Sequence, residues 1–394
     1  MDTPKILVLN SWADDWDMKR VQGSPENAYI LNGLAKRGWK LTIIAPLGEY
    51  RGPEPFEVIK FRRKRIGGTK YIAFIKGILS YIASNLSLYK EGKKLLLKKS
   101  YNGIWGIGSD TSIALFLLKR KFGKPSVIKI PGVSTLNQFS SLIKALPYHY
   151  SVLIAFNLSF DLFIFVDDGS EAHKVAERIG IKKEKFSLLP NPYPNDWEIV
   201  KNKRGELRKK YNIPEGTILI GWASRFGRLK GIDFLPTIVK SVLEENEKVI
   251  FLIAGNGNLN LLKNKISNER VKFVGFLPHR EMLNFFLPLD IFISTNIYAN
   301  YTLPVIEASY LGIPVVIFDV GETHKAVLEG ETGFLIPPFD IQKFVERILQ
   351  LAENEKLRIE MGKKAEKFIR ENHISWSERV EKEATLLLNV LEKR

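Results

Sequence analysis

Short apolar runs with strand character alternate with amphipathic helical runs along most of this 394-residue chain. The first such unit places a strand-like run at residues 5–10, then a helical pattern, then a second strand-like run at residues 41–45. Strands that alternate with helices form parallel sheets, because each helix carries the chain back to start the next strand beside the last. The order of elements therefore predicts an α/β fold.

Length and a proline-rich connector predict two domains. Single cores rarely grow beyond about 250–300 residues, so 394 residues suit two cores. Three prolines fall within residues 190–194, which makes this segment stiff and non-helical. Because the strand–helix alternation starts again after it, we predict two Rossmann-like parallel-sheet domains with a cleft between them. Their predicted bounds are residues 1–190 and 191–375, followed by a last helix at residues 376–394.

Positive charge is concentrated in one part of the chain. Residues 51–130 hold 18 basic and 4 acidic residues, which is nearly all of the net charge of +16. Within this region, residues 62–99 place an apolar helical face between basic clusters, a pattern typical of a helix that lies on an anionic membrane surface. The alternative is a helix with its apolar face on the core and a solvated basic flank.

Nucleic acid is not an expected partner of this basic region, because no aromatic platform or known binding motif accompanies the charge.

Composition excludes several other classes of protein. With no cysteine, the chain has no disulfide, thiolate metal site or cysteine nucleophile. The longest apolar stretch, residues 150–166, contains Asn157 and Asp161 and is too short to cross a bilayer. We therefore expect a cytoplasmic protein, at the inner face of the membrane if the basic helix binds lipid. The abundance of Lys, Glu and Ile is typical of hyperthermophiles.

Loops at residues 224–231, 255–258 and 295–303 each follow a predicted strand of the second half. Ligands of open α/β sheets bind outside the carboxyl ends of the strands, so we expect these loops to form one site. The first half lacks such a site for a nicotinamide or flavin cofactor, because only Gly23 lies in its first strand-to-helix turn.

The side chains of these loops suit a nucleoside diphosphate. Arg225 and Lys230 supply cations for phosphates, and Glu307, one or two turns inside the next helix, supplies a carboxylate for ribose hydroxyls. The start of that helix offers free backbone N–H groups to phosphate. The alternative is that Arg225 and Lys230 are ordinary surface charges and that Glu307 is simply solvated.

The order and spacing of these motifs resemble those of the retaining GT-B glycosyltransferases of family four, over nearly the whole chain. The similar segments are Ser-Arg-Phe-Gly-Arg-Leu-Lys-Gly at 224–231, Leu-Ile-Ala-Gly-Asn-Gly at 252–257, Glu-Ala at 307–308, Gly-Ile-Pro-Val-Val at 312–316 and Gly-Glu-Thr-Gly-Phe-Leu-Ile-Pro-Pro at 330–338. The resemblance implies a GT-B fold, with two Rossmann-like domains facing each other across a cleft. It also implies that the last helix crosses back to the N-terminal domain.

The resemblance further implies a hexosyltransferase activity. A sugar would move from a UDP- or GDP-linked nucleotide-sugar to a glycolipid, polysaccharide or other glycan acceptor, with retention of anomeric configuration. Arg225, Lys230 and Glu307 would be the catalytic set, in which the cations stabilise the departing diphosphate, so that neither a metal nor a cofactor is required. The implied donor-binding residues are Gly23, Gly255, Asn256, Gly257, Phe276, Tyr301, Thr302 and Leu303.

Two positions depart from the family's pattern. Ala299 stands where the first Glu of a paired-Glu motif usually holds the donor sugar, and Pro131 replaces a His near the anomeric centre. Candidates for the lost sugar contacts are Asp14, Asp15, Asn296 and Tyr298. The departures leave a second hypothesis open, a catalytically silent GT-B protein that binds a nucleotide-sugar or a partner enzyme.

Overall fold

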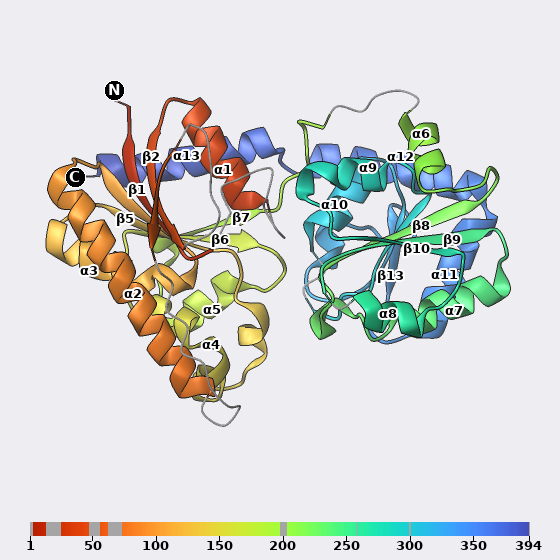
Figure 1. The fold of residues 1–394 in the computed structure, drawn as a ribbon, viewed down its shortest axis with the longest axis horizontal. Coiled ribbons are helices and arrows are strands. Elements are labelled where there is room, and N and C mark those ends of the chain that lie inside the picture. The colour runs from red at the N-terminus through yellow and green to blue at the C-terminus, as the bar shows by residue number, and fades with distance from the viewer. Residues whose placement is uncertain are drawn as a thin grey trace. The chain divides into compact units, whose positions relative to one another are not determined.

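The computed structural model describes residues 3–12, 25–46, 56–61, 73–197, 203–257, 259–298 and 301–393. The chain divides into two compact units. Unit 1 consists of Met1–Pro190 and Ser377–Arg394, and unit 2 of Asn191–Trp376. Figure 1 shows that each unit is a sheet with helices on both faces. This arrangement confirms the predicted α/β fold with two Rossmann-like parallel-sheet domains.

Within the described residues, unit 1 contains a seven-stranded parallel sheet in the order β3-β2-β1-β4-β5-β6-β7. Its inner strands are mostly apolar on both faces, as expected for strands covered by helices on each side, although β5 also buries Lys129. In chain order the strands are β1 (Lys5–Asn10), β2 (Lys40–Pro46), β3 (Glu57–Phe61), β4 (Gly103–Ile107), β5 (Ser126–Ile130), β6 (Leu162–Asp167) and β7 (Phe186–Pro190).

The helices of unit 1 form two layers around this sheet. One face packs on α1 (Glu26–Lys36) and α13 (Trp376–Glu392), which Figure 1 draws beside each other in red and blue. The other face packs on α2 (Ala73–Lys98), α3 (Ser112–Phe122), α4 (Leu142–Phe156) and α5 (Ala172–Ile179). The helix at the end of the chain therefore supplies core residues to the unit that begins the chain, among them Val380, Ala384 and Leu387.

Buried charged side chains join α13 to the rest of unit 1. Lys129 Nζ lies 2.8 Å from Glu26 Oε1 and 3.0 Å from Glu383 Oε1. Arg379 Nη2 lies 2.6 Å from Glu26 Oε1, and its Nη1 donates to the carbonyl oxygen of Pro190 at 2.6 Å. Burial alone would raise the pKa of Glu26, but the charges of Lys129 and Arg379 outweigh it and lower that pKa below its ordinary value.

The described part of unit 2 contains a six-stranded parallel sheet in the order β10-β9-β8-β11-β12-β13. Its strands are β8 (Ile218–Ala223), β9 (Val249–Ala254), β10 (Val271–Gly275), β11 (Ile291–Ser294), β12 (Val315–Phe318) and β13 (Gly333–Ile336). One face packs on α7 (Leu235–Glu245), α8 (Leu259–Lys265) and α11 (Ile341–Glu353). On the other lie α6 (Lys203–Lys210), α9 (Met282–Phe286), α10 (Leu303–Tyr310) and α12 (Glu355–Asn372).

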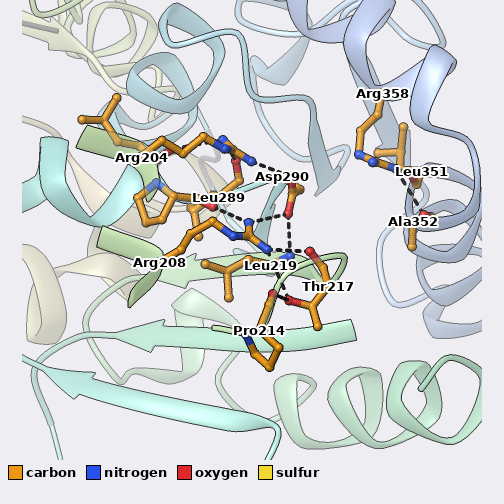
Figure 2. A network of polar contacts seen from close by, with 12 residues as sticks. Arg204, Arg208, Pro214, Thr217, Leu219, Leu289, Asp290, Leu351, Ala352 and Arg358 are labelled. Carbon is orange, nitrogen blue, oxygen red and sulfur yellow. Dashed lines mark hydrogen bonds and ion pairs between the residues drawn. The ribbon is translucent and has the colours of Figure 1, made fainter. Parts of the chain in front are cut away.

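Asp290 ties α6 to the starts of two strands in unit 2, as Figure 2 shows. Its carboxylate accepts hydrogen bonds from the N–H of Leu219 at 2.7 Å, from Arg208 Nη1 at 3.0 Å and from Arg204 Nη2 at 2.6 Å. Arg208 also donates to the carbonyl oxygen of Thr217 at 2.6 Å. This network holds α6 at the amino ends of β8 and β11, away from their carboxyl ends.

Helix α2 exposes apolar residues on the side opposite to its packed face. The packed side is partly polar, with Ser84 and Asn85 buried beside Leu88. The exposed apolar side chains are those of Ile75, Leu79, Ile82, Leu86 and Leu97. The alternative in which the predicted apolar face packs on the core is therefore wrong for Ile75, Leu79, Ile82 and Leu86, although α2 packs on the core through Leu88 and Leu95. Residues 62–72 of the predicted basic and apolar segment lie outside the described residues. Among the described helices, none has the length and apolar character needed to cross a membrane.

Candidate functional site

The loops that follow β8 and β11 are joined by hydrogen bonds at the carboxyl edge of the unit 2 sheet. Thr295 Oγ1 donates to the carbonyl oxygen of Lys230 at 3.0 Å. The N–H of Ile297 donates to the carbonyl oxygen of Leu229 at 3.1 Å. The structure therefore brings together two of the loops that the sequence analysis grouped into one site.

Glycine is required where these loops approach each other. Gly231 has φ +66°, and a Cβ there would lie 1.7 Å from the carbonyl oxygen of Thr295. A Cβ on Gly255 would lie 2.0 Å from the carbonyl oxygen of Ser224. Since any side chain at these positions would push the backbones apart, the glycines fix how closely the loops after β8, β9 and β11 pack.

The two predicted cations lie in the loop after β8. The side chain of Arg225 is exposed, and that of Lys230 is half-buried. Asn256 and Gly257 are exposed in the neighbouring loop, where the carbonyl oxygen of Asn256 accepts from the N–H of Phe226 at 2.8 Å. Cationic side chains and glycine-rich backbone therefore share one edge, a combination that suits phosphate.

Helix α10 begins beside these loops. Thr302 has extended backbone angles of φ −113° and ψ 153°, and its carbonyl oxygen accepts from the N–H of Val305 at 3.1 Å. Leu303 is the first helical residue, and Pro304 follows it. The first N–H groups of a helix have no partner within it, so this end carries a partial positive charge.

Tyr301 precedes the helix and is fixed from two sides. Asn191 Nδ2 donates to its carbonyl oxygen at 3.1 Å, and its hydroxyl lies 3.2 Å from Nδ1 of the buried His373. The side chain of Tyr301 is buried in the core of unit 2. This residue therefore anchors the start of α10 through its ring while its backbone leads into Thr302.

Glu307 lies in the second turn of α10 and is only 1% exposed. Its Oε1 lies 2.6 Å from Nε2 of His279, a residue that is 6% exposed. The alternative in which Glu307 is a solvated helix residue is therefore wrong. His279 is not among the residues predicted from the sequence, although it follows Phe276, Leu277 and Pro278 directly after β10.

The other predicted site residues differ in where they lie. Phe276 follows β10 and is 39% exposed, Asn296 is buried and Tyr298 is half-buried, all in unit 2. Pro131, at the position of the replaced His, follows β5 in unit 1 and is half-buried. Four positions named in the sequence analysis lie outside the described residues, namely Asp14, Asp15, Gly23 and Ala299. Their roles stay predictions.

The family model that matches this chain lies within unit 2. Residues 203–368 match the model of the family described as Glycosyl transferases group 1. The O-antigen biosynthesis glycosyltransferase WclY of Escherichia coli is 35% identical over 131 residues, which are 32% of this chain and 35% of that protein. The UDP-Gal:alpha-D-GlcNAc-diphosphoundecaprenol alpha-1,3-galactosyltransferase of Escherichia coli is 22% identical over 294 residues, 71% of this chain and 75% of that protein. The chain spans about a third of the length of the WclY relatives.

Comparison with solved structures extends the similarity to the whole fold. The structure of Anabaena HepE in complex with UDP-glucose matches with a TM-score of 0.72 and 16% identity, covering 98% of this chain and 99% of that one. At this identity the match speaks for the fold alone. The chain thus has a GT-B fold, and its residues 203–368 carry the sequence pattern of the Glycosyl transferases group 1 family.

Proposed function

We propose that this protein is a hexosyltransferase that moves a sugar from a nucleotide-sugar to a glycan or lipid-linked acceptor with retention of anomeric configuration. The observation that carries the proposal is the carboxylate of Glu307, buried in the second turn of α10. Thr295, in the loop that leads to this helix, bonds to the carbonyl oxygen of Lys230, in the loop that also carries Arg225. A carboxylate, two cations and a helix N-terminus form the set that a nucleoside diphosphate needs.

In this proposal the diphosphate binds at the start of α10. Arg225 and Lys230 contact its oxygens, with the backbone of Thr302 and Leu303 as further donors. As the bond between the sugar and the diphosphate breaks, negative charge grows on the leaving oxygen, and the two cations and the helix dipole stabilise it. The chain's own charges thus perform the task that a metal ion has in other transferases, and we propose metal-independent transfer.

Glu307 accepts hydrogen bonds from the ribose hydroxyls, and the half-exposed ring of Phe276 lies at the same edge to contact the base. We put UDP-linked donors first and GDP-linked donors second, because a UDP-sugar is named both in the galactosyltransferase relative and in the HepE complex. We propose that Asn296, Tyr298, Asp14 and Asp15 contact the sugar. They would replace the contacts of the Glu and His that the family has at the positions of Ala299 and Pro131.

We propose that the acceptor is lipid-linked. We also propose that α2 contacts the membrane that holds this acceptor. The name of the galactosyltransferase relative includes a diphosphoundecaprenol-linked acceptor. On α2, the exposed Leu79, Ile82 and Leu86 lie on a helix that also carries Lys90, Lys94 and Lys98, all exposed. Apolar side chains that enter the lipid and lysines that pair with anionic headgroups form the pattern of an interfacial helix.

Titration of UDP and GDP tests the nucleotide site. We expect Arg225→Ala to raise the Kd about 10-fold or more, since a hydrogen bond to a charged group contributes about 1.5–3 kcal/mol. Arg228→Ala is the matched control, because Arg228 lies in the same loop with its side chain 93% exposed, and we expect its Kd to stay within about twofold of the parent's. Equal effects of the two substitutions, or no binding of either nucleotide, would contradict the proposed site.

Transfer assays with UDP- and GDP-sugars in excess EDTA then test the chemistry. We expect turnover with EDTA present and a product whose anomeric proton shows retention by NMR. Turnover that EDTA abolishes would contradict the metal-independent step, and inversion would contradict the assigned stereochemistry. Nucleotide-sugar binding without turnover, across a panel of donors and acceptors, would instead support the catalytically silent alternative.

Co-sedimentation with vesicles tests the membrane contact. We expect binding to vesicles that contain phosphatidylglycerol and much weaker binding to pure phosphatidylcholine. The double substitution Leu79→Gln and Leu86→Gln should reduce the bound fraction, whereas Ile359→Gln, at a 50% exposed apolar position of α12, should not. Equal pelleting with both kinds of vesicle would contradict the role of charge, and equal pelleting of the α2 variant would contradict the role of α2.

A further inference from the structure

The side chain of His279 is held in place by its own backbone and by the ring of Trp197, both in unit 2. Pro278, with φ −60° and ψ 149°, directs the chain from the end of β10 into the short helix His279–Glu281. The imidazole lies 5.9 Å from the ring of Trp197, centroid to centroid, with the ring planes 36° apart. A buried ring that is constrained by backbone and by an aromatic neighbour keeps one orientation.

This orientation places Nε2 of His279 2.6 Å from Oε1 of Glu307, with their side chains 5% and 2% exposed. The two residues are 28 positions apart: His279 begins the short helix after β10, and Glu307 lies in the second turn of α10. A carboxylate oxygen only accepts, so Nε2 donates to it in the tautomer that carries the proton on Nε2. A hydrogen bond to a charged acceptor inside the protein is stronger than one between neutral groups.

The bond has a consequence for the second oxygen of the carboxylate. The terminal torsion of a glutamate is broad, so a carboxylate without a partner rotates over a wide range. Holding Oε1 fixes the plane of the group, and Oε2 then has a defined direction. An acceptor that is fixed before the ligand arrives loses less conformational entropy on binding than a mobile one.

We infer that His279 is a positioning residue that holds Glu307 so that this carboxylate can accept hydrogen bonds from the ribose hydroxyls of a bound nucleoside diphosphate. The inference rests on the proposed function, because it needs Glu307 to contact the ribose. In this inference His279 acts on the nucleotide only through the carboxylate of Glu307, which it contacts. Its loss should therefore affect ligands only in so far as they carry ribose hydroxyls.

Selectivity for the ribose separates this role from a merely structural one. The Kd values are measured for UDP and GDP and for their 2′,3′-dideoxy forms, and the ratio of dideoxy to ribose Kd is the readout. We expect His279→Ala to reduce this ratio about 3- to 10-fold, since a hydrogen bond contributes about 0.5–1.5 kcal/mol net. His279→Gln, whose amide nitrogen reaches about as far as Nε2, should restore most of the ratio, whereas the shorter His279→Asn should not.

Two further variants complete the experiment. Glu307→Ala should reduce the ratio at least as much as His279→Ala does, and His324→Ala, at an exposed histidine of the same unit, should leave it unchanged. Should His279→Ala not fold, the comparison of His279→Gln with His279→Asn carries the test. An unchanged ratio in Glu307→Ala would overturn the ribose contact of the proposed function. Two outcomes would overturn the role of His279 alone. In the first, the ratio is reduced in Glu307→Ala but equals that of the parent in all His279 variants. In the second, the His279 variants bind ribose and dideoxy ligands more weakly by the same factor.

Discussion

Lys129 Nζ and Glu26 Oε1 lie 2.8 Å apart inside unit 1, and Lys129 has no exposed surface. The same oxygen of Glu26 also pairs with Arg379 of α13. One carboxylate of α1 thus bonds to side chains from a central strand and from the last helix. Burying charges is costly, so such a cluster is stable only while all of its members are present.

Truncating Lys129 should therefore destabilise the protein strongly. We expect Lys129→Ala to lower the free energy of unfolding by about 3–5 kcal/mol, because it leaves two buried carboxylates with one cation. Urea denaturation measures the change. Lys94→Ala removes an ion pair with Glu91 at the surface and should change the free energy of unfolding by less than about 1 kcal/mol. A similar, small effect of both substitutions would show that the cluster does not contribute in this way.

His373 should make stability depend on pH. Burial lowers the pKa of His373, and its hydrogen bond to the carbonyl oxygen of Lys325 opposes this shift only in part. The folded protein thus favours the neutral ring, while the unfolded chain binds a proton near pH 6.5. Stability from this group is complete above about pH 6.5 and decreases as the pH falls towards the lower folded-state pKa.

We therefore expect the free energy of unfolding of the parent protein to decrease between pH 7.5 and 5.5, and to decrease less in His373→Gln. Denaturation curves at the two pH values give both differences. The variant loses the bond to the hydroxyl of Tyr301 at either pH, so only the change between the two pH values is diagnostic. Identical pH dependence in the parent and the variant would contradict the shifted pKa.

Asp290 should stabilise the fold mainly through the hydrogen bonds that its carboxylate accepts, and less through its negative charge alone. We expect Asp290→Ala to lower the free energy of unfolding by about 2–4 kcal/mol, because the N–H of Leu219 and the guanidinium of Arg208 lose their acceptor. Asp290→Asn keeps one acceptor oxygen and should cost less. Asp233→Ala, at an exposed aspartate 3.8 Å from Arg228, is the control and should have little effect in the same denaturation experiment.

Gly231 should tolerate no side chain, in contrast to Gly227 of the same loop. Gly231→Ala meets the carbonyl oxygen of Thr295 and requires a left-handed residue, which costs about 1–2 kcal/mol for a residue other than glycine. Gly227 has φ −144°, and a Cβ there has nothing within 4 Å. We expect only Gly231→Ala to lower the melting temperature and to weaken UDP binding. Comparable behaviour of the two variants in thermal unfolding and titration would contradict this account of the loop.

Much of the fold could be predicted from the sequence, because the alternation of elements is a local property. Buried parallel strands such as β9 are continuous apolar runs that end at glycine, and such runs are visible without any structure. The edge strand β3 was not predicted. Its five residues include Glu57 and Lys60, and so short a mixed run has no clear period.

Less of the site could be predicted, because its main contact joins residues that are distant in sequence. Spacing and order pointed to Glu307, but the bond to His279 depends on where a loop 28 positions earlier ends. Helix α2 shows a related limit. Periodicity finds an apolar face, whereas only the packing reveals that Ser84 and Asn85 face the core and Leu79 does not.

The place of α13 in unit 1 has a consequence for synthesis of the protein. The sheet of unit 1 is complete after Pro190, but one of its faces lacks Val380, Ala384 and Leu387 until α13 has emerged from the ribosome. Unit 2 is continuous in sequence and has all of its core residues earlier. During translation from the N-terminus, unit 1 therefore stays incompletely folded while unit 2 folds. Over this time its apolar face and the charges of Glu26 and Lys129 are not covered by α13.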